Sequence, residues 1–164
     1  MNWYLMLRLL HIVSAMLFIG GVAARQVLRS VANTTHDVRT FVVLNHAGGR
    51  IETGMVMPGF LGVIVFGVLL ALTTRTPMAG LLQGGSQNWL LVSLLLLGVD
   101  LLTMPVVNRQ RGKHFDDMVQ EAVAIGHMTP QLRAELTNST IRWMYCTQLV
   151  VPVVIVVLMV LKPF

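Results

Sequence analysis

The residues in this chain whose types best suit chemistry are three ionisable side chains that interrupt long apolar runs. Arg8 and His11 lie in the first run, and Asp100 lies in a later one. Arg8 and His11 are three positions apart, which places them on one face of a helix. Histidine has a reference pKa near neutral, so His11 could switch protonation state or ligate a metal. An ionisable group at membrane depth costs about 2.5–3.5 kcal/mol on insertion scales, so it marks a candidate functional site.

The depths of these side chains can be compared by counting along their helices. From the tryptophan that begins each helix, His11 lies roughly 12 Å and Asp100 roughly 16 Å below the same membrane surface. Gln148, in the last apolar run, reaches a comparable depth. We therefore predict a buried polar cluster of Arg8, His11, Asp100 and Gln148 in the outer half of the membrane. Two interpretations stay open: a charge pair that fixes helix register, or a functional site.

Apolar composition indicates the solvent in which these helices lie. The chain has 164 residues, is 55% hydrophobic and 12% charged, and has a mean hydropathy of +0.72. Four apolar runs each approach the ~20 residues needed to cross the hydrocarbon core; they cover residues 3–22, 54–72, 89–107 and 144–161. The fold class that we predict is all-α, a four-helix transmembrane bundle forming one domain, residues 1–164, in contact with the lipid bilayer. The expected helices are about 3–32, 51–74, 88–125 and 130–161.

Basic residues are distributed unevenly between the connections. Nine lie in the two long connections, against one in the short loop and one near the C-terminus. The positive-inside rule then predicts cytoplasmic long connections and both termini outside, N-out/C-out, in a multi-pass protein of the cell (plasma/inner) membrane. The net charge of +5 does not indicate a nucleic-acid partner, because the basic residues cluster at helix ends and form no stripe with aromatics.

Local signals predict helix ends in the cytoplasmic extensions, which we expect to be helical. Gly126 can stop one helix, and Thr129 can cap the next with Pro130 at its first position. The segment 32–50, with Asn33, Gly48 and Gly49, is expected to hold the turn of the first hairpin. Prolines inside the apolar runs are expected to kink or open their helices; they are Pro58, Pro105 and Pro152.

Small residues in the second run predict its packing face. Glycine and alanine let helix backbones approach closely in lipid, especially at small-xxx-small spacing. The helix-packing residues that we predict are Gly59, Gly62, Gly67 and Ala71.

Four short stretches of the chain resemble a known family in the same order. Tyr4–Ala15 reads YLMLRLLHIVSA and resembles the opening YLWLKLLHVLSA of a bacterial family of predicted integral membrane proteins, domain of unknown function 2269. Met57–Gly59, Met104–Val107 and Val157–Pro163 resemble later elements of that family. The resemblance implies four helices and no established activity.

The opening is also distantly similar to CopD-type copper-resistance proteins and HemJ-type protoporphyrinogen oxidases. The first helix of both carries a histidine near a Leu-His pair, a feature that matches Leu10-His11 here. This similarity implies haem b or copper at His11. The His-x-Lys element of the HemJ type is replaced by Gln87-Asn88-Trp89, and the missing lysine argues against protoporphyrinogen oxidation.

Three functional hypotheses follow. The leading one is a non-catalytic accessory or structural subunit of a membrane complex, associated with itself or with other subunits through glycine-bearing helix faces and holding no cofactor by default. It rests on the lack of a Walker motif, nucleophile elbow or paired cysteine motif. The second is a haem b- or copper-binding redox protein using His11, with Met16 or Met104 as second ligand. The third is a small transporter or proton relay using His11 and Asp100.

Overall fold

The computed structural model describes residues 2–74 and 88–162, and within them the side chains of 99–111 and 140–142 are not described. The described residues are helical throughout, apart from short turns and ends, which confirms the predicted all-α class for this part of the chain. The elements in order are α1 (Trp3–Thr34), α2 (Val38–Ile51), the π-helix η1 (Glu52–Val56), α3 (Met57–Thr74), α4 (Trp89–Ile125), α5 (Pro130–Leu136) and α6 (Ser139–Leu161).

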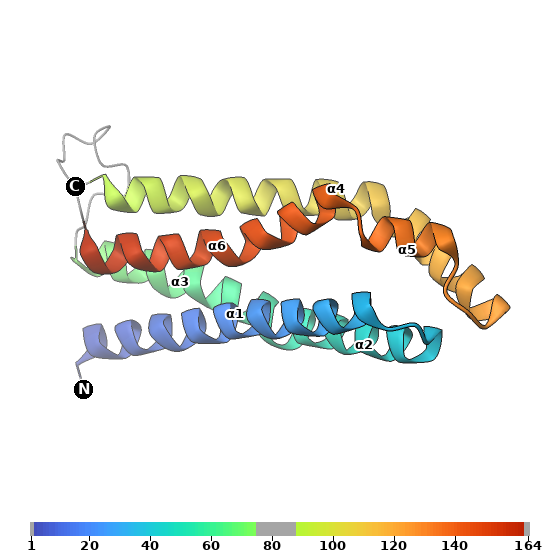
Figure 1. The fold of residues 1–164 in the computed structure, drawn as a ribbon. Coiled ribbons are helices and arrows are strands. Elements are labelled where there is room, and N and C mark those ends of the chain that lie inside the picture. The colour runs from blue at the N-terminus through green and yellow to red at the C-terminus, as the bar shows by residue number, and fades with distance from the viewer. Residues whose placement is uncertain (1, 75–87, 163–164) are drawn as a thin grey trace.

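The long helices run side by side, and the start of α1 lies at the same end of the molecule as the end of α6 (Figure 1). Within the described part of the chain, three helical stretches are long and apolar enough to cross a membrane: Trp3–Thr34, Val38–Thr74 and Trp143–Leu161. The described apolar part of α4 is shorter, Trp89–Gly98, although the helix continues beyond it. The fourth span and the orientation of the termini therefore remain predictions, and the predicted outer loop lies largely outside the described residues.

Helices α1 and α3 form a tight antiparallel pair that we call the glycine seam. Its contacts run through glycines, whose missing side chains let the two backbones approach. A Cβ atom added at Gly59 would lie 2.6 Å from the backbone nitrogen of Phe18, and one added at Gly62 would collide with the Ser14 side chain. Gly21, on α1, allows a similarly close approach to η1. The glycines of this pair therefore permit close backbone approach.

The remaining membrane helices join the pair through α6, which packs on both α1 and α4. A small apolar cluster of Phe18, Val22 and Val56 lies beside this junction, with Leu149 of α6 packed against it. The Phe18 ring meets the Phe60 ring at a centroid distance of 5.6 Å. The main contacts of the described residues thus arrange the membrane helices in the order α3, α1, α6, α4.

A second apolar core lies where α2 and α5 meet the C-terminal parts of α1 and α4, and we call this region the head. Its buried residues are Ala32, Val38, Phe41, Met118, Ala122 and Leu132. Phe41 is 2% exposed and Leu132 is 0% exposed. Phe115 presents its ring edge to Phe41 at 6.4 Å between centroids. The largest fully buried side chains of the described residues are therefore in the head, outside the most apolar parts of the chain.

Helix ends in the head follow local sequence chemistry. Gly126 ends α4 in the left-handed conformation, with φ of 84°. The hydroxyl of Thr129 accepts a hydrogen bond from the amide of Leu132 at 3.3 Å, and Pro130 is the first residue of α5. These predicted signals are confirmed.

The first hairpin turns within the expected segment, but not at its glycines. Asp37 caps α2, and its carboxylate accepts hydrogen bonds from the amides of Arg39 and Thr40. Helix therefore begins again at Val38, not near residue 51, and Gly48 lies inside α2. A second correction concerns the helix expected over 130–161, which is interrupted after Leu136 and resumes at Ser139.

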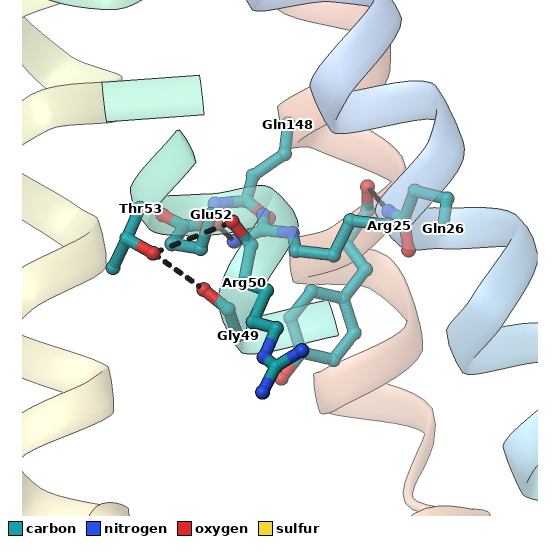
Figure 2. Close-up of polar contacts among 8 residues, drawn as sticks. Arg25, Gln26, Gly49, Arg50, Glu52, Thr53 and Gln148 are labelled. Atoms are coloured by element: carbon teal, nitrogen blue, oxygen red, sulfur yellow. Dashed lines mark hydrogen bonds and ion pairs between the residues drawn. The ribbon is translucent and has the colours of Figure 1, made fainter. Parts of the chain in front are cut away.

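The prediction of a local opening near Pro58 is confirmed by η1. The amide of Met57 bonds to the carbonyl of Glu52, five residues back, as in a π-helix. The Thr53 hydroxyl donates to the carbonyls of Gly49 and Arg50 at 3.2 and 3.3 Å (Figure 2). The wider turn accommodates a proline that cannot donate a backbone hydrogen bond. Pro152 lies inside α6, and Pro105 lies within helical α4, with its side chain outside the described ones.

Candidate functional site

Arg25, in the C-terminal half of α1, is a charged side chain in the interior, with 9% of its surface exposed. Its Nη1 donates to a carboxylate oxygen of Glu52, and its Nη2 donates to the amide oxygen of Gln148 at 2.5 Å. Figure 2 shows the three side chains converging from α1, η1 and α6. An ion pair with such additional hydrogen bonds is the form in which a buried charge is tolerated. Arg25 thus connects three elements.

The next turns of α1 contact α6 a second time. The side-chain amide of Gln26 donates to the backbone carbonyl of Tyr145. The guanidinium of Arg29 lies over the Tyr145 ring, 3.4 Å from its centroid. A guanidinium stacked on an aromatic face is attracted by the ring quadrupole, and its in-plane N–H groups remain available to other acceptors.

Two donors in this cluster have no hydrogen-bond partner among the described residues. They are the Nε atom of Arg25 and the Nη1 atom of Arg29, both buried. Arg25 and Arg29 are four residues apart on one face of α1, so the two positive charges are neighbours. The side chain of Glu52 forms an ion pair with Arg25. These two N–H donors of Arg25 and Arg29 are therefore available to bind an acceptor.

A cavity of about 510 Å³ opens beside these arginines, between the head and the membrane helices. Arg25, Arg29, Glu52 and Tyr145 line its polar side. The apolar residues of its lining include Phe41, Leu44 and Phe115, which belong to the head. Two residues with carboxylate side chains, Asp116 and Glu135, also line the cavity. The volume is that of a small-molecule site.

His11 lies elsewhere, in the glycine seam. Its Nδ1 is 3.1 Å from the backbone carbonyl oxygen of Val63 on α3. A carbonyl only accepts, so Nδ1 carries a proton, and in the neutral imidazole Nε2 retains a lone pair. A Cβ atom added at Gly67 would lie 3.0 Å from the imidazole Cε1 atom, so this glycine makes room for the ring. Ala71, the last of the predicted packing residues, is 8% exposed.

The polar cluster expected from sequence is divided in the structure. Gln148 binds Arg25, which lies fourteen residues beyond His11 on α1, or about 21 Å along the helix. Arg8 is exposed. Asp100 lies in α4, and its side chain is outside the described ones, so the proton relay with His11 stays a prediction. The depth of Gln148 was counted along the backbone of α6. That count does not show which side chain Gln148 pairs with.

Sequence reasoning missed Arg25, Arg29 and Glu52 because they were interpreted only as charges at helix ends. A signal was present: two arginines one turn apart end the first apolar run, and an acid immediately precedes the second. In an antiparallel hairpin these positions lie at the same level. Opposite charges at equal depth on adjacent helices are candidates for a pair.

Comparison with known proteins places the chain in a family. The family model described as predicted integral membrane protein (DUF2269) matches residues 5–163. The chain belongs to this family. No curated protein and no solved structure matches the chain. Membership of the DUF2269 family makes this an integral membrane protein and assigns no activity.

In this DUF2269 member, His11 has no second metal ligand beside it among the described side chains. No group of three or more His, Cys, Asp and Glu side chains able to hold a metal occurs among residues 2–74 and 88–162 as described. Met16 is 69% exposed and lies five residues after His11, about 140° round the helix, so the two point different ways. The side chain of Met104, the other predicted ligand, is outside the described ones.

Proposed function

We propose that the chain is a non-catalytic accessory or structural subunit of a membrane complex, anchored by its apolar helices and binding its partner through the head. The observation that carries this proposal is the second apolar core. α2, α5 and the ends of α1 and α4 build a folded unit around Phe41 and Leu132. Crossing a bilayer requires only the apolar spans, so a separately packed head indicates a role in contact with another molecule.

The surface of the head adds support. Val43 on α2 is 67% exposed, and Val123 and Ile125 at the end of α4 are 51% and 49% exposed. By the predicted topology this surface faces the cytoplasm, where exposed branched side chains gain from being covered by a partner. Exposed apolar residues of the spans need no partner, since lipid covers them.

Site-specific photo-crosslinking in intact membranes tests the proposal. A crosslinking amino acid at Val43 is expected to give a discrete adduct with a second protein, or with a second copy of this chain. The same amino acid at Leu61 of α3, which is 62% exposed, is the matched control and is expected to react with lipid. Native mass spectrometry of the purified complex should then show the same partner in a fixed ratio. Protein adducts absent at Val43 and Val123 would contradict the proposal.

A second candidate function, haem or copper binding through His11, is favoured by one specific contact. Histidines that ligate metals commonly donate their other ring N–H to a carbonyl or carboxylate, and the contact with Val63 has this form. The Nε2 atom is the one that would bind the metal, and a second ligand would have to come from outside the described side chains. A bound haem would supply one-electron chemistry.

An optical spectrum of the purified protein, oxidised and reduced, with metal analysis of the same sample, tests this candidate. A Soret band or stoichiometric copper that is lost in His11→Ala and kept in His46→Ala would establish the site. His46 is an exposed histidine of α2 and serves as the control. A clear spectrum with no stoichiometric metal would end the cofactor hypothesis.

A further inference from the structure

We propose that the cavity between the head and the membrane helices binds a phosphate group through Arg25 and Arg29. Both arginines line the cavity, and each has one buried N–H donor without a partner among the described residues. An unpaired buried donor costs free energy, which an acceptor ligand would recover. Two guanidinium groups one helical turn apart suit an anion with several oxygens, because charge-assisted bonds to phosphate are strong and directional.

Among the described residues, one of the two guanidinium groups forms an ion pair and the other does not, which favours an anion beside Arg29; the carboxylates of Asp116 and Glu135 line the same cavity. Glu52 compensates Arg25, with which it forms an ion pair, whereas Arg29 lies against the neutral ring of Tyr145. Stacking on the Tyr145 ring holds the Arg29 guanidinium in place, and its buried Nη1 donor has no partner among the described residues. The binding group is therefore preorganised and retains a positive charge.

The depth of the arginines indicates where the phosphate comes from. Arg25 is twenty-two residues after Trp3 on one continuous helix, which is about 33 Å along its axis. The hydrocarbon core of a bilayer is about 30 Å thick. If Trp3 lies at one interface, Arg25 and Arg29 lie where lipid phosphates of the opposite leaflet are found.

The rest of the cavity suits a phospholipid. Leu28, Leu44 and Met144 are among its apolar lining residues and can contact the start of an acyl chain. The carboxylate of Asp116 also lines it, and a carboxylate accepts hydrogen bonds from hydroxyl or ammonium groups such as headgroups carry. A free phosphate compound shares the central chemistry, and the experiment separates the two sources.

Thermal stability of the detergent-purified chain measures the binding. The additives are a short-chain phosphatidylglycerol, the diacylglycerol with the same chains, inorganic phosphate and glycerol phosphate. We expect the phosphatidylglycerol to raise the unfolding temperature saturably and the diacylglycerol to leave it unchanged. Saturable stabilisation by the soluble phosphates alone would assign the site to a free phosphate compound. Equal stabilisation by the diacylglycerol would overturn the proposal.

Two variants link the effect to the cavity. Arg29→Gln removes a charged donor and is expected to weaken apparent affinity about tenfold or more. Arg39→Gln, at an exposed arginine of α2, makes the same charge change and should leave the affinity unaltered. Equal affinity in the two variants would contradict the proposal.

A third variant, Gly48→Leu, keeps both arginines and fills the space. A Cβ atom at Gly48 would lie 4.0 Å from the Cγ atom of Arg25, and Gly48 lines the cavity. Gly48→Leu therefore blocks the site while replacing a helical glycine with a better helix former. We expect a folded protein that phosphatidylglycerol no longer stabilises. Unchanged stabilisation of Gly48→Leu would place the ligand elsewhere and overturn the assignment.

Discussion

The head and the glycine seam are two regions of one chain that pack through different kinds of contact. In the head, large side chains such as Phe41 and Leu132 are removed from the surface almost completely. In the seam, Gly59 and Gly62 bring backbones into contact. In water, burial of apolar area is the main force that favours packing. Lipid tails are as apolar as leucine, so only close packing and hydrogen bonds favour helix association in the seam. The difference indicates which solvent surrounds each region.

The largest effect is expected from Phe41→Ala. Removing a fully buried aromatic ring should destabilise the head by about 3–5 kcal/mol. Hydrogen exchange should show lost protection of amides in α2 and α5, while amides of α3 near Val63 stay protected. Val43→Ala, at an exposed site on the same helix, is the control. Equal loss of protection in head and seam would show that the two regions unfold as one.

A methyl group placed in the seam should have the next largest effect. Gly59→Ala puts a Cβ atom 2.6 Å from the backbone nitrogen of Phe18, and α1 and α3 must move apart. Overpacking of this kind costs about 1–3 kcal/mol. Thermal unfolding in detergent measures it, with Gly20→Ala as control because a Cβ there meets nothing within 4 Å. If the two variants have equal stability, the seam is not a close backbone contact.

Glu52→Gln tests the junction between the two regions. Arg25 would keep its charge in the interior and lose its carboxylate partner, at a cost of about 1.5–3 kcal/mol. Glu121→Gln changes an exposed glutamate of α4 and controls for net charge. The double variant Arg25→Gln with Glu52→Gln should recover part of the loss in unfolding temperature. Full additivity of the two single changes would mean that the ion pair carries no coupling.

The smallest expected effect is a pH dependence confined to the head. Hydrogen bonds from the Thr40 hydroxyl and from the amides of Thr40 and Arg39 hold the pKa of Asp37 below its ordinary value. A lowered pKa in the folded state means that the carboxylate stabilises the head above the unfolded pKa of about 3.9. This contribution is lost as pH falls through the lower folded value. Asp37→Asn should therefore unfold with a weaker pH dependence below about pH 4 than the parent, as measured by circular dichroism.

Local chemistry made part of the fold predictable. The stop at Gly126 and the cap at Thr129 depend on a few neighbouring atoms, so sequence alone identified them. Gly48 misled the turn prediction, because a glycine inside a helix has the same sequence signature as one in a loop. Asp37 held the stronger signal, a capping side chain immediately before the helix.

The candidate site was less predictable because it depends on which helices are neighbours. Depth along a span can be counted from the sequence, but the rotation of a helix and the reach of a long side chain cannot. Gln148 was therefore grouped with His11, whereas Arg25 reaches it from α1. Arg29 and Tyr145 are 116 positions apart, and only the packing of α1 against α6 brings them together.

The unbroken helical path from Val38 to Thr74 has a mechanical consequence. α2, η1 and α3 follow one another without a turn between them, and α4 runs for 37 residues, or about 55 Å, from the membrane into the head. Two continuous helical stretches therefore cross from one region to the other, and Glu52, the first residue of the π-helix, forms an ion pair with Arg25. We therefore expect a displacement of the head to be accompanied by a change in the tilt of α3 and α4.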